Sequence, residues 1–477
     1  MRPGFVLAYP APPFSWVRQD LLPETADADM HIFYNECGHV QPNYHAHHPK
    51  MQGVFAGEKP LPQADISCYY LPLLQKNDYT RARQMAEMSL EMKEERNRLL
   101  RESVKKIVST KVAKRAAEID RAGIFPRDMA ELFAQQGFLS VMLPESFGGM
   151  DGDLTAFCII AEEIAYACGS SALMMLAHSV GLIPLMVAGN NEQKKRFYNR
   201  VAKDHALAAF ALTEPEAGSD AASLKTTAAL EGDCYLLNGR KCMVTNGGAA
   251  DLYAVFVTSR PGERTKGISV FMVEKDTAGL AIGKREEKMG MHGSDTTDLI
   301  FENAAVPKEN LLGEEGGGWE IAMMTLNLSR PAIGALALGI AQGALDFALA
   351  YTTKRVQFGQ ALADFQGVQF MLADMAMLAE AARALVYKAA TFLDQKVYER
   401  DKMSALGMDK LSAMAKCFAS DAAMQVTADA VQILGGYGYL KDYPVERMMR
   451  DAKVTQIFEG SNQVQRVIIA RDLLRKV

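Results

Sequence analysis

The side chains that could do chemistry gather in three short stretches of the sequence. The first reads LTEPEAGSD and runs from Leu212 to Asp220, directly after a run of strand-forming residues. The hydroxyls of Thr213 and Ser219, with backbone amides freed at the end of the strand, could donate hydrogen bonds to a polar ring or a phosphate. Gly218 would let such a ligand approach the backbone closely. By itself, a loop of this composition is more often just a turn.

A second loop reads MVTNGG and begins at Met243. Asn-Gly pairs are strong signals for hairpin turns, and the pattern predicts such turns at Asn238-Gly239 and at Asn246-Gly247. Because the first of these turns would fold the chain back on itself, we expect the loops that begin at Leu212 and Met243 to converge.

The third stretch reads TQIFEGSNQVQR and lies near the C-terminus. Ser461 or Asn462 is a good N-cap for a final helix, which leaves Glu459 in the loop before it. A lone glutamate in a loop is usually solvated. Its apolar neighbours Ile457 and Phe458 change that expectation, because a carboxyl group pressed against apolar atoms has its pKa raised toward the working range of a general base.

The elements that position these stretches follow the order α, β, α. Helical spacing of apolar residues runs from about residue 87 to about residue 203, with breaks at 123–126, 144–152 and 189–191. Short β-runs follow, and helical spacing returns after the glycines at 316–318. The predicted domains are an N-terminal extension over 1–85, a helical domain over 86–205, a β domain over 206–315 and a helical domain over 316–477.

Composition places the chain among folded globular proteins. Of its 477 residues, 49% are hydrophobic and 23% are charged, which excludes wholesale disorder, collagen-like repeats and coiled coil. The formal charge of −5 provides no global basic field, so we expect no nucleic-acid partner. The seven cysteines form no CxxC pair, and the N-terminus lacks the pattern of a signal peptide. We therefore expect a cytoplasmic protein without a disulfide framework.

The longest apolar stretch, Ala332–Tyr351, has the length of a membrane span. It is interrupted by Gln342 and Asp346 and is rich in glycine and alanine, a pattern typical of a tightly packed buried helix. We expect no membrane span.

Taken together, the stretches make the chain resemble the acyl-CoA dehydrogenase family, in its medium- and short-chain branch. The resemblance runs from about residue 90 to the C-terminus and is carried, in this order, by LTEPEAGSD, MVTNGG, KRVQFG, QILGGYGYLKDYPVERMMRDAK and QIFEGSNQVQR. It implies an α+β multidomain fold with an N-terminal helical domain, a middle β-barrel and a C-terminal four-helix domain. It also implies FAD, bound between barrel and helices and often shared between the subunits of a homotetramer.

The resemblance gives Glu459 the role of the base that removes the α-proton of an acyl-CoA thioester, while the β-hydrogen leaves as hydride to flavin N5. That α-proton is only weakly acidic, so the enolate-like charge on the carbonyl oxygen must be stabilised by donors aimed at it. In the family those donors are the base residue's own N–H and a ribityl hydroxyl of FAD. A branch similar to isovaleryl-CoA dehydrogenase takes its base from the position before a helix arginine. Here Ser329 stands there, before Arg330, and serine cannot serve.

Further site residues are implied by the same resemblance. For the cofactor they are Phe210, Leu212, Thr213, Ser219, Met243, Val244, Thr245, Arg355, Gln357, Phe358, Phe365, Gln366, Gln432, Gly435, Gly436, Ser461 and Gln463. For the substrate they are Ser219, Asn327, Arg330, Phe458 and Gly460. Arg355 matches an arginine that pairs with the FAD pyrophosphate, to which its planar fork of donors is suited. For Arg355 and Arg330, a structural ion pair within a helical bundle is the alternative.

Three features depart from the family's pattern. Met243 stands where Trp or Phe is common against the flavin, and Phe210 stands where close relatives have Tyr. The N-terminal extension has no counterpart that we recognise. Its metal-capable side chains are those of Cys37, His39, His45, His47 and His48. Their spacing fits no zinc signature, so we expect no metal site.

The expected function is FAD-dependent dehydrogenation of an acyl-CoA to a trans-2-enoyl-CoA, with electrons passed to an electron-transferring flavoprotein. An acyl-CoA oxidase would use the same fold and base but give electrons to oxygen, and the family's oxidases are typically longer at the C-terminus. A catalytically silent member would bind acyl-CoA or a partner complex without turnover, which the presence of Glu459 and Arg355 disfavours. The sequence does not fix the acyl group.

Overall fold

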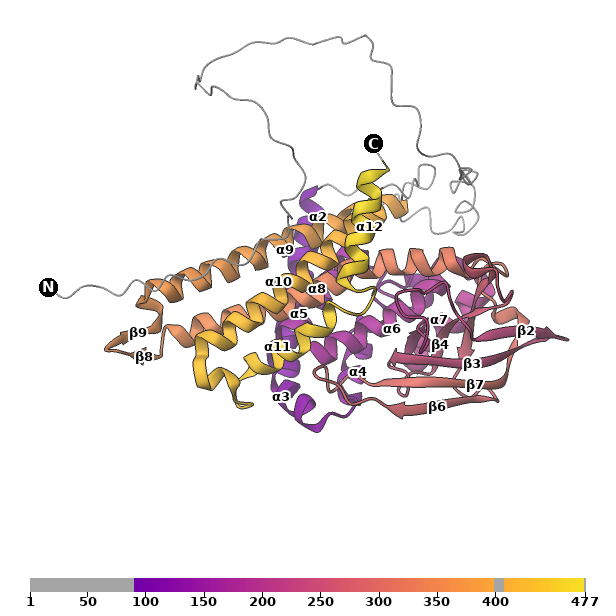
Figure 1. The fold of residues 1–477 in the computed structure, drawn as a ribbon, viewed down its shortest axis with the longest axis horizontal. Coiled ribbons are helices and arrows are strands. Elements are labelled where there is room, and N and C mark those ends of the chain that lie inside the picture. Colours follow the sequence, from indigo (N-terminus) through magenta and orange to yellow (C-terminus); the bar gives the residue numbers. More distant parts are fainter. Residues whose placement is uncertain (1–89, 399–406, 476–477) are drawn as a thin grey trace, which may run out of the picture. The chain divides into compact units, whose positions relative to one another are not determined.

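The computed structural model describes residues 90–398 and 407–475, and the fold below concerns those residues. They form helices, then strands, then helices, which confirms the predicted fold class (Figure 1). The N-terminal extension, with its cluster of cysteine and histidine side chains, lies outside the described residues.

The first helical domain begins at Leu90. Its helices are α2 (Leu90–Ile107), α3 (Ala113–Ala122), α4 (Arg127–Gln135), α5 (Leu154–Ala167), α6 (Gly169–Ala188) and α7 (Asn191–Asp204). A π-helical turn joins α2 to α3. Each of the three predicted breaks falls within or beside an interruption between helices, whereas the junction of α5 and α6 at Cys168 was not predicted. Asp153 caps α5 by accepting a hydrogen bond from the amide of Ala156 at 2.8 Å.

The middle domain, expected as a β-barrel, is a curled sheet of seven strands. The strands are β1 (Ala208–Ala211), β2 (Thr227–Glu231), β3 (Cys234–Thr245), β4 (Leu252–Thr258), β5 (Ile268–Glu274), β6 (Leu280–Arg285) and β7 (Thr296–Pro307). They are ordered β1-β4-β2-β3-β7-β6, with β5 also paired to β4. Every residue of β4 is buried, because helix α6 packs beside β1 and β4. A Cβ at Gly181 of α6 would lie 2.7 Å from the amide nitrogen of Ala209, so glycine lets the helix lie directly on the strand.

The predicted hairpin turn at Asn238-Gly239 is wrong. Both residues lie inside β3, where the register with β7 shifts between Leu237 and Gly239. The hairpin is formed earlier, at Gly232-Asp233, because Glu231 of β2 pairs with Cys234 of β3. Pairing of β3 with β7 along its second edge outweighs the local turn preference of Asn-Gly. The second pair, Asn246-Gly247, forms a turn that ends β3, but not the predicted hairpin, because β3 pairs with β2 and β7 rather than with β4.

The C-terminal domain is built around the long helix α8 (Gly318–Thr352). The other elements are β8 (Val356–Gln357), β9 (Gln360–Ala361), α9 (Gln366–Tyr398), α10 (Met408–Leu434), α11 (Pro444–Thr455) and α12 (Asn462–Leu474). Helix α8 packs against α5, α9 and α10. A Cβ at Gly339 would lie 2.2 Å from the carbonyl oxygen of Glu162, so the glycines of α8 allow α5 to approach its backbone.

Two described helices, α6 and α8, have the length and hydropathy of a membrane span. Most residues of both are buried against other elements of the protein, which is the environment of core helices. The prediction that Ala332–Tyr351 forms a buried helix is confirmed.

A buried histidine ties the helical domain to the sheet and predicts an acid-sensitive stability. Nδ1 of His178 accepts a hydrogen bond from the amide of Ala208 at 3.0 Å, so Nε2 carries the proton and donates to the carbonyl oxygen of Leu139 at 2.7 Å. Burial lowers the pKa of His178 to about 4. In the unfolded chain the imidazole takes up a proton at higher pH than in the folded protein, so stability falls as the pH drops from about 6.5 toward 4.

When the pH falls from 7.5 to 5, protonation of this histidine in the unfolded chain should lower the free energy of unfolding of the wild type by about 2 kcal/mol. The variant His178→Gln can keep both hydrogen bonds without titrating, so its loss of stability over the same interval should be smaller by that amount. Denaturant unfolding of both proteins at the two pH values measures the difference. Equal pH dependence in the two proteins would show that His178 is not protonated on unfolding.

Candidate functional site

Glu459 lies in the short turn between α11 and α12. The amide of Phe458 donates to the carbonyl oxygen of Val454, and the amide of Asn462 donates to that of Gln456. The side chain of Ser461 caps α12, as the sequence predicted. Glu459 and Gly460 have φ values of 57° and 89°, both in the left-handed region. Because this region is unfavourable for a residue with a Cβ, surrounding contacts must hold Glu459 there.

The Glu459 carboxylate is held by a serine. Oε2 of Glu459 accepts a hydrogen bond from the Ser329 hydroxyl of α8 at 2.7 Å. Burial raises the pKa of Glu459, against the opposing effects of this hydrogen bond and of the charges of Arg330 and Lys416. Of its two apolar neighbours, Phe458 packs against the core and Ile457 is exposed. The site therefore contains a half-buried carboxyl group with its pKa shifted toward that of a general base.

The carbonyl groups of the turn face a cluster of donors. Arg330 Nε and Gln465 Nε2 donate to the carbonyl oxygen of Glu459 at 3.3 and 3.1 Å. Gln465 Nε2 and Lys416 Nζ donate to that of Gly460 at 2.8 and 2.9 Å. Within the described residues the backbone N–H of Glu459 has no hydrogen-bond partner. The turn therefore directs its carbonyls into the protein and leaves one amide donor beside the carboxylate.

Three of the side chains that contact the turn have no local signal in the sequence for this contact. The sequence excludes Ser329 as a base, and only the structure shows its hydrogen bond to Glu459. Gln465 stood inside a quoted motif without a role. Lys416 carried no local signal, since a single lysine in a helical pattern usually faces solvent.

The predicted substrate residues Asn327 and Arg330 are both buried in α8. Arg330 Nη1 donates to Oδ1 of Asn327 at 3.0 Å, and Nδ2 of Asn327 donates to Asp409. A Cβ at Gly460 would lie 2.7 Å from Nε2 of Gln465, so glycine at this position also makes room for that amide. Contact of these residues with a substrate stays a prediction.

The loops that begin at Leu212 and Met243 do converge, through β3 rather than through the predicted hairpin. The amide of Cys242 donates to the carbonyl oxygen of Thr213 at 2.9 Å. The hydroxyls of Thr213, Ser219 and Thr245 make no hydrogen bond within the described part of the chain. An added Cβ at Gly218 would meet no atom within 4 Å. Free donors beside an open backbone are what a polar ring or a phosphate requires.

A buried ion pair fixes the first of these loops. Lys241 is fully buried and donates to Oε1 of Glu214 at 2.7 Å and to the carbonyl oxygen of Leu212 at 3.1 Å. Glu214 also accepts the amides of Lys225 and Thr226 at 2.6 and 3.0 Å. Burial lowers the pKa of Lys241 to about 8, while the nearby Glu214 carboxylate opposes that shift. The pair thus ties the loop to Lys241 of β3 and to the residues that precede β2.

Phe210 and Met243, the two side chains that depart from the family's pattern, differ in their surroundings. Phe210 packs against Phe256 with ring centroids 4.9 Å apart, so this position is part of the sheet's packing. Met243 has φ of 55° at an irregularity of β3, and 71% of its surface is exposed. Its side chain is therefore free to contact a ligand or another chain.

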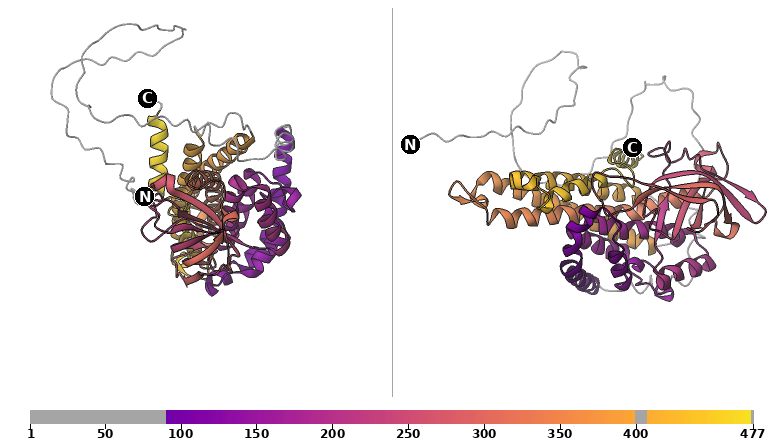
Figure 2. Two further views of the ribbon diagram at one scale, coloured as in Figure 1. Left: turned by 90° about the vertical axis from the view of Figure 1, so that its right-hand side faces the viewer. Right: turned by 90° about the horizontal axis from the view of Figure 1, so that it is seen from below.

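Of the remaining predicted cofactor residues, Ser461 and Gln463 lie at the start of α12 beside Glu459, and those around Arg355 and Gly435 lie at the other end of the C-terminal helices. The Arg355 guanidinium stacks over the Tyr437 ring at 5.3 Å, which brings it beside the segment that holds Gln432, Gly435 and Gly436. Phe358, at the tip of the hairpin formed by β8 and β9, is 94% exposed. This hairpin lies at the end of α8 and α9 away from the sheet (Figures 1 and 2). A single chain therefore separates the predicted cofactor residues into two groups.

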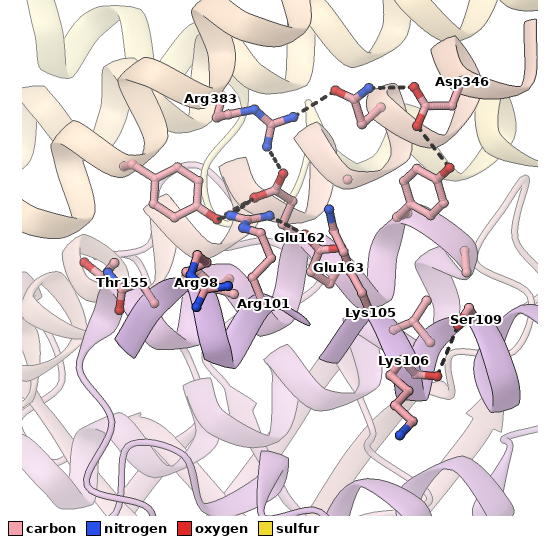
Figure 3. A pocket seen from close by; sticks show the side chains of 18 of the residues that line it. Arg98, Arg101, Lys105, Lys106, Ser109, Thr155, Glu162, Glu163, Asp346 and Arg383 are labelled. Atoms are coloured by element: carbon pink, nitrogen blue, oxygen red, sulfur yellow. Dashed lines mark hydrogen bonds and ion pairs between the residues drawn. The ribbon is translucent and has the colours of Figure 1, made fainter. Parts of the chain in front are cut away.

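A cavity of about 1150 Å³ lies elsewhere, between α2, α5, α8 and α9 (Figure 3). Arg101 and Arg383 both reach Glu162 there, and Arg383 also donates to Gln342 at 2.8 Å. None of the predicted site residues lines this cavity. The carboxylates of Glu162 and Glu163 are thus paired with these arginines at the contact between the two helical domains. Among the described residues, no group of three His, Cys, Asp or Glu side chains could hold a metal ion.

Three family models match in sequence: the acyl-CoA dehydrogenase N-terminal domain over 94–205, the middle domain over 209–304 and the C-terminal domain over 316–474. The acyl-CoA dehydrogenase of Bacillus subtilis is 47% identical over 377 residues, which cover 79% of this chain and 97% of that protein. This chain belongs to the acyl-CoA dehydrogenase family. The cyclohex-1-ene-1-carbonyl-CoA dehydrogenase of Geobacter metallireducens is 46% identical over 80% of the chain and 98% of that protein.

Solved structures of acyl-CoA dehydrogenases share the fold. Butyryl-CoA dehydrogenase from Megasphaera elsdenii matches with a TM-score of 0.75 and 42% identity, over 80% of this chain and 98% of that one. A chain from work on the electron transferring flavoprotein of Acidaminococcus fermentans matches with a TM-score of 0.76 and 44% identity, over 80% of this chain and 98% of that chain. An acyl-CoA dehydrogenase from Bacillus anthracis complexed with FAD matches with a TM-score of 0.74 and 34% identity, over 82% of this chain and 68% of that chain.

The acyl-CoA dehydrogenase is thus an FAD-dependent oxidoreductase. The free hydroxyls of Thr213, Ser219 and Thr245 and the open backbone at Gly218 fit this cofactor. Gly435 and Gly436 likewise have open space where a Cβ would stand.

Proposed function

We propose that this dehydrogenase converts an acyl-CoA thioester to a trans-2-enoyl-CoA, with Glu459 as the base that removes the α-proton. The supporting observation is the state of Glu459: its carboxylate is held by Ser329 at 2.7 Å, and its pKa is raised by burial. A base with a raised pKa binds a proton more readily.

The chain's own groups account for the proton transfer. Removal of the α-proton develops negative charge on the thioester carbonyl oxygen, and a donor aimed at that oxygen contributes about 3–4 kcal/mol. The unpartnered N–H of Glu459 is such a donor. When bound, FAD supplies the acceptor that takes the β-hydrogen as hydride. Glu459 then holds the α-proton, and the Ser329 hydroxyl keeps the carboxyl group in place.

We also propose that two copies of the chain complete each cofactor site, within a homotetramer. The loop at Thr213 is bonded to β3 of the sheet, whereas Arg355 directly precedes the β8–β9 hairpin at the end of α8 and α9 away from the sheet (Figures 1 and 2), which supports a cofactor site completed by two chains. The exposed Phe358 and the hairpin around it would be covered by the second copy. In a symmetric oligomer each site can take its arginine from the partner chain.

Subunit mixing tests this arrangement. Arg355→Ala should lose FAD on dialysis, and Glu459→Gln should keep FAD without turnover. When the two variants are unfolded, mixed and refolded together, or co-expressed, activity should return to about a quarter of the wild-type value, because half of the random pairs are mixed and each has one intact site. Absence of recovery, with mixed oligomers demonstrated by differential tags, would place both residues in one chain's site.

The electron acceptor is proposed to be an electron-transferring flavoprotein, and the location cytoplasmic. The match to a chain from work on such a flavoprotein supports the first, and the absence of CxxC pairs supports the second. The assay is a visible spectrum of the purified protein, followed by a panel of straight, branched, cyclic and dicarboxylic acyl-CoAs with a one-electron dye or with oxygen alone.

Each outcome of that assay selects one function. Bleaching of the flavin with dye turnover supports the dehydrogenase. Peroxide release at a comparable rate would identify an oxidase, and a colourless protein without turnover would identify a silent acyl-CoA-binding member. The relatives named above act on acyl groups as different as butyryl and cyclohexenyl, so the same panel also defines the acyl group.

A further inference from the structure

Lys416 of α10 is fully buried next to the Glu459–Gly460 turn. Its Nζ donates to the carbonyl oxygen of Gly460 at 2.9 Å and to Oδ1 of Asn462 at 2.9 Å. Burying an ammonium group is costly unless it is hydrogen-bonded and near an opposite charge. Neither of its two acceptors is charged, so the hydrogen bonds alone do not account for a lysine at this position.

The backbone conformation of the turn must be stabilised by contacts with other elements. Glu459 and Gly460 both have positive φ, and the left-handed region costs a residue such as glutamate about 1–2 kcal/mol. Asn462, the first residue of α12, donates through Nδ2 to Asp421 at 2.7 Å. Lys416 therefore joins both the turn and the start of α12 to α10, and Asn462 adds a second bond to α10 through Asp421.

We propose that Lys416 is a positioning residue for Glu459: its ammonium group fixes the turn that carries the base, and its charge favours the ionised carboxylate. The inference rests on the proposed role of Glu459 as the base. Lys416 does not touch the substrate or the reacting atoms; it acts through the backbone of Gly460 and through its electric field.

The charges around the Glu459 carboxylate support the proposed effect of the Lys416 charge on its ionisation. Arg330 and Lys416 both oppose the effect of burial on the pKa of Glu459, as does the Ser329 hydrogen bond. Burial lowers the pKa of Lys416 itself to about 8, and the neighbouring Glu459, Cys417 and Asp421 counteract that shift while Arg330 adds to it. Lys416 thus stays charged at neutral pH. Arg330 keeps its charge, so a substitution that removes the Lys416 charge tests the effect of that one cation on the Glu459 carboxylate.

The test is the pH profile of flavin reduction by the thioester that the dye assay selects, in wild type, Lys416→Met and Lys416→Gln. Without the cation the carboxyl group ionises at higher pH, so the acid limb should move up by about one pH unit in both variants. At pH values below the limb this is about a tenfold loss of rate. Lys416→Gln should keep more of the plateau rate, because its amide can still donate to the carbonyl of Gly460.

Lys410→Met is the matched control, since it removes a lysine of the same helix that pairs with Asp472 of α12 at 2.7 Å. Its acid limb should coincide with that of the wild type. If Lys416→Met and Lys416→Gln lower the rate by one factor at every pH, Lys416 is merely structural and the proposal is overturned. FAD content and the thermal midpoint, measured alongside, show that each variant is folded and loaded. A fast Glu459→Gln variant would instead overturn the proposed function itself.

Discussion

Glu459→Gln is expected to slow flavin reduction by acyl-CoA by about 10² to 10⁴, the usual contribution of a positioned general base. Glutamine has the same size and can still accept the Ser329 hydrogen bond through its amide oxygen, so the turn should keep its conformation. The backbone N–H of Glu459 is also unchanged by the substitution. FAD content and affinity for the thioester should therefore stay close to the wild-type values, while the α-proton has no acceptor.

Stopped-flow bleaching of the flavin measures this rate directly, and binding of the product enoyl-CoA measures ligand affinity. Glu302→Gln provides the control, because Glu302 is exposed on β7 and its carboxyl group is remote in sequence from every predicted site residue. Reduction of Glu459→Gln at the wild-type rate would show that another group removes the proton.

Glu214→Ala is expected to destabilise the fold by about 3–5 kcal/mol, the cost of leaving one partner of a buried ion pair alone. Removal of this carboxylate leaves the ammonium of Lys241 without its counter-charge and the amides of Lys225 and Thr226 without their acceptor. The loop from Leu212 to Ser219 should loosen, and FAD retention should fall with it. Urea unfolding and the ratio of flavin to protein after dialysis measure the two effects.

Glu216→Ala is a matched control in the same loop, because Glu216 pairs with Lys225 at the exposed surface. Surface ion pairs are worth about 0–1 kcal/mol, so this variant should differ little from wild type. The double variant Glu214→Ala/Lys241→Met should recover much of the lost stability, since it removes the stranded charge. A small effect of Glu214→Ala, similar to that of Glu216→Ala, would contradict the importance of the buried pair.

The sequence by itself determined the order of the domains and the identity of the base candidate. Helical spacing with breaks at glycine and proline located the junctions of α3 with α4 and of α6 with α7, because those signals act over a few residues, but it did not locate the junction of α5 with α6. Ser461 was recognised as an N-cap for the same reason. The turn at Asn238-Gly239 failed because β3 pairs along both edges, and strand pairing is decided by neighbours that are distant in sequence.

Only the tertiary structure decided what surrounds Glu459. Ser329, Lys416 and Gln465 come from three different helices, and nothing in the local pattern of α8 or α10 shows that their side chains meet one turn. The separation of Arg355 from the loop at Thr213 is likewise a property of the long helix between the sheet and the β8–β9 hairpin. Local signals in a sequence report on backbone preferences, whereas the pKa of a carboxyl group depends on charges and burial that long-range packing supplies.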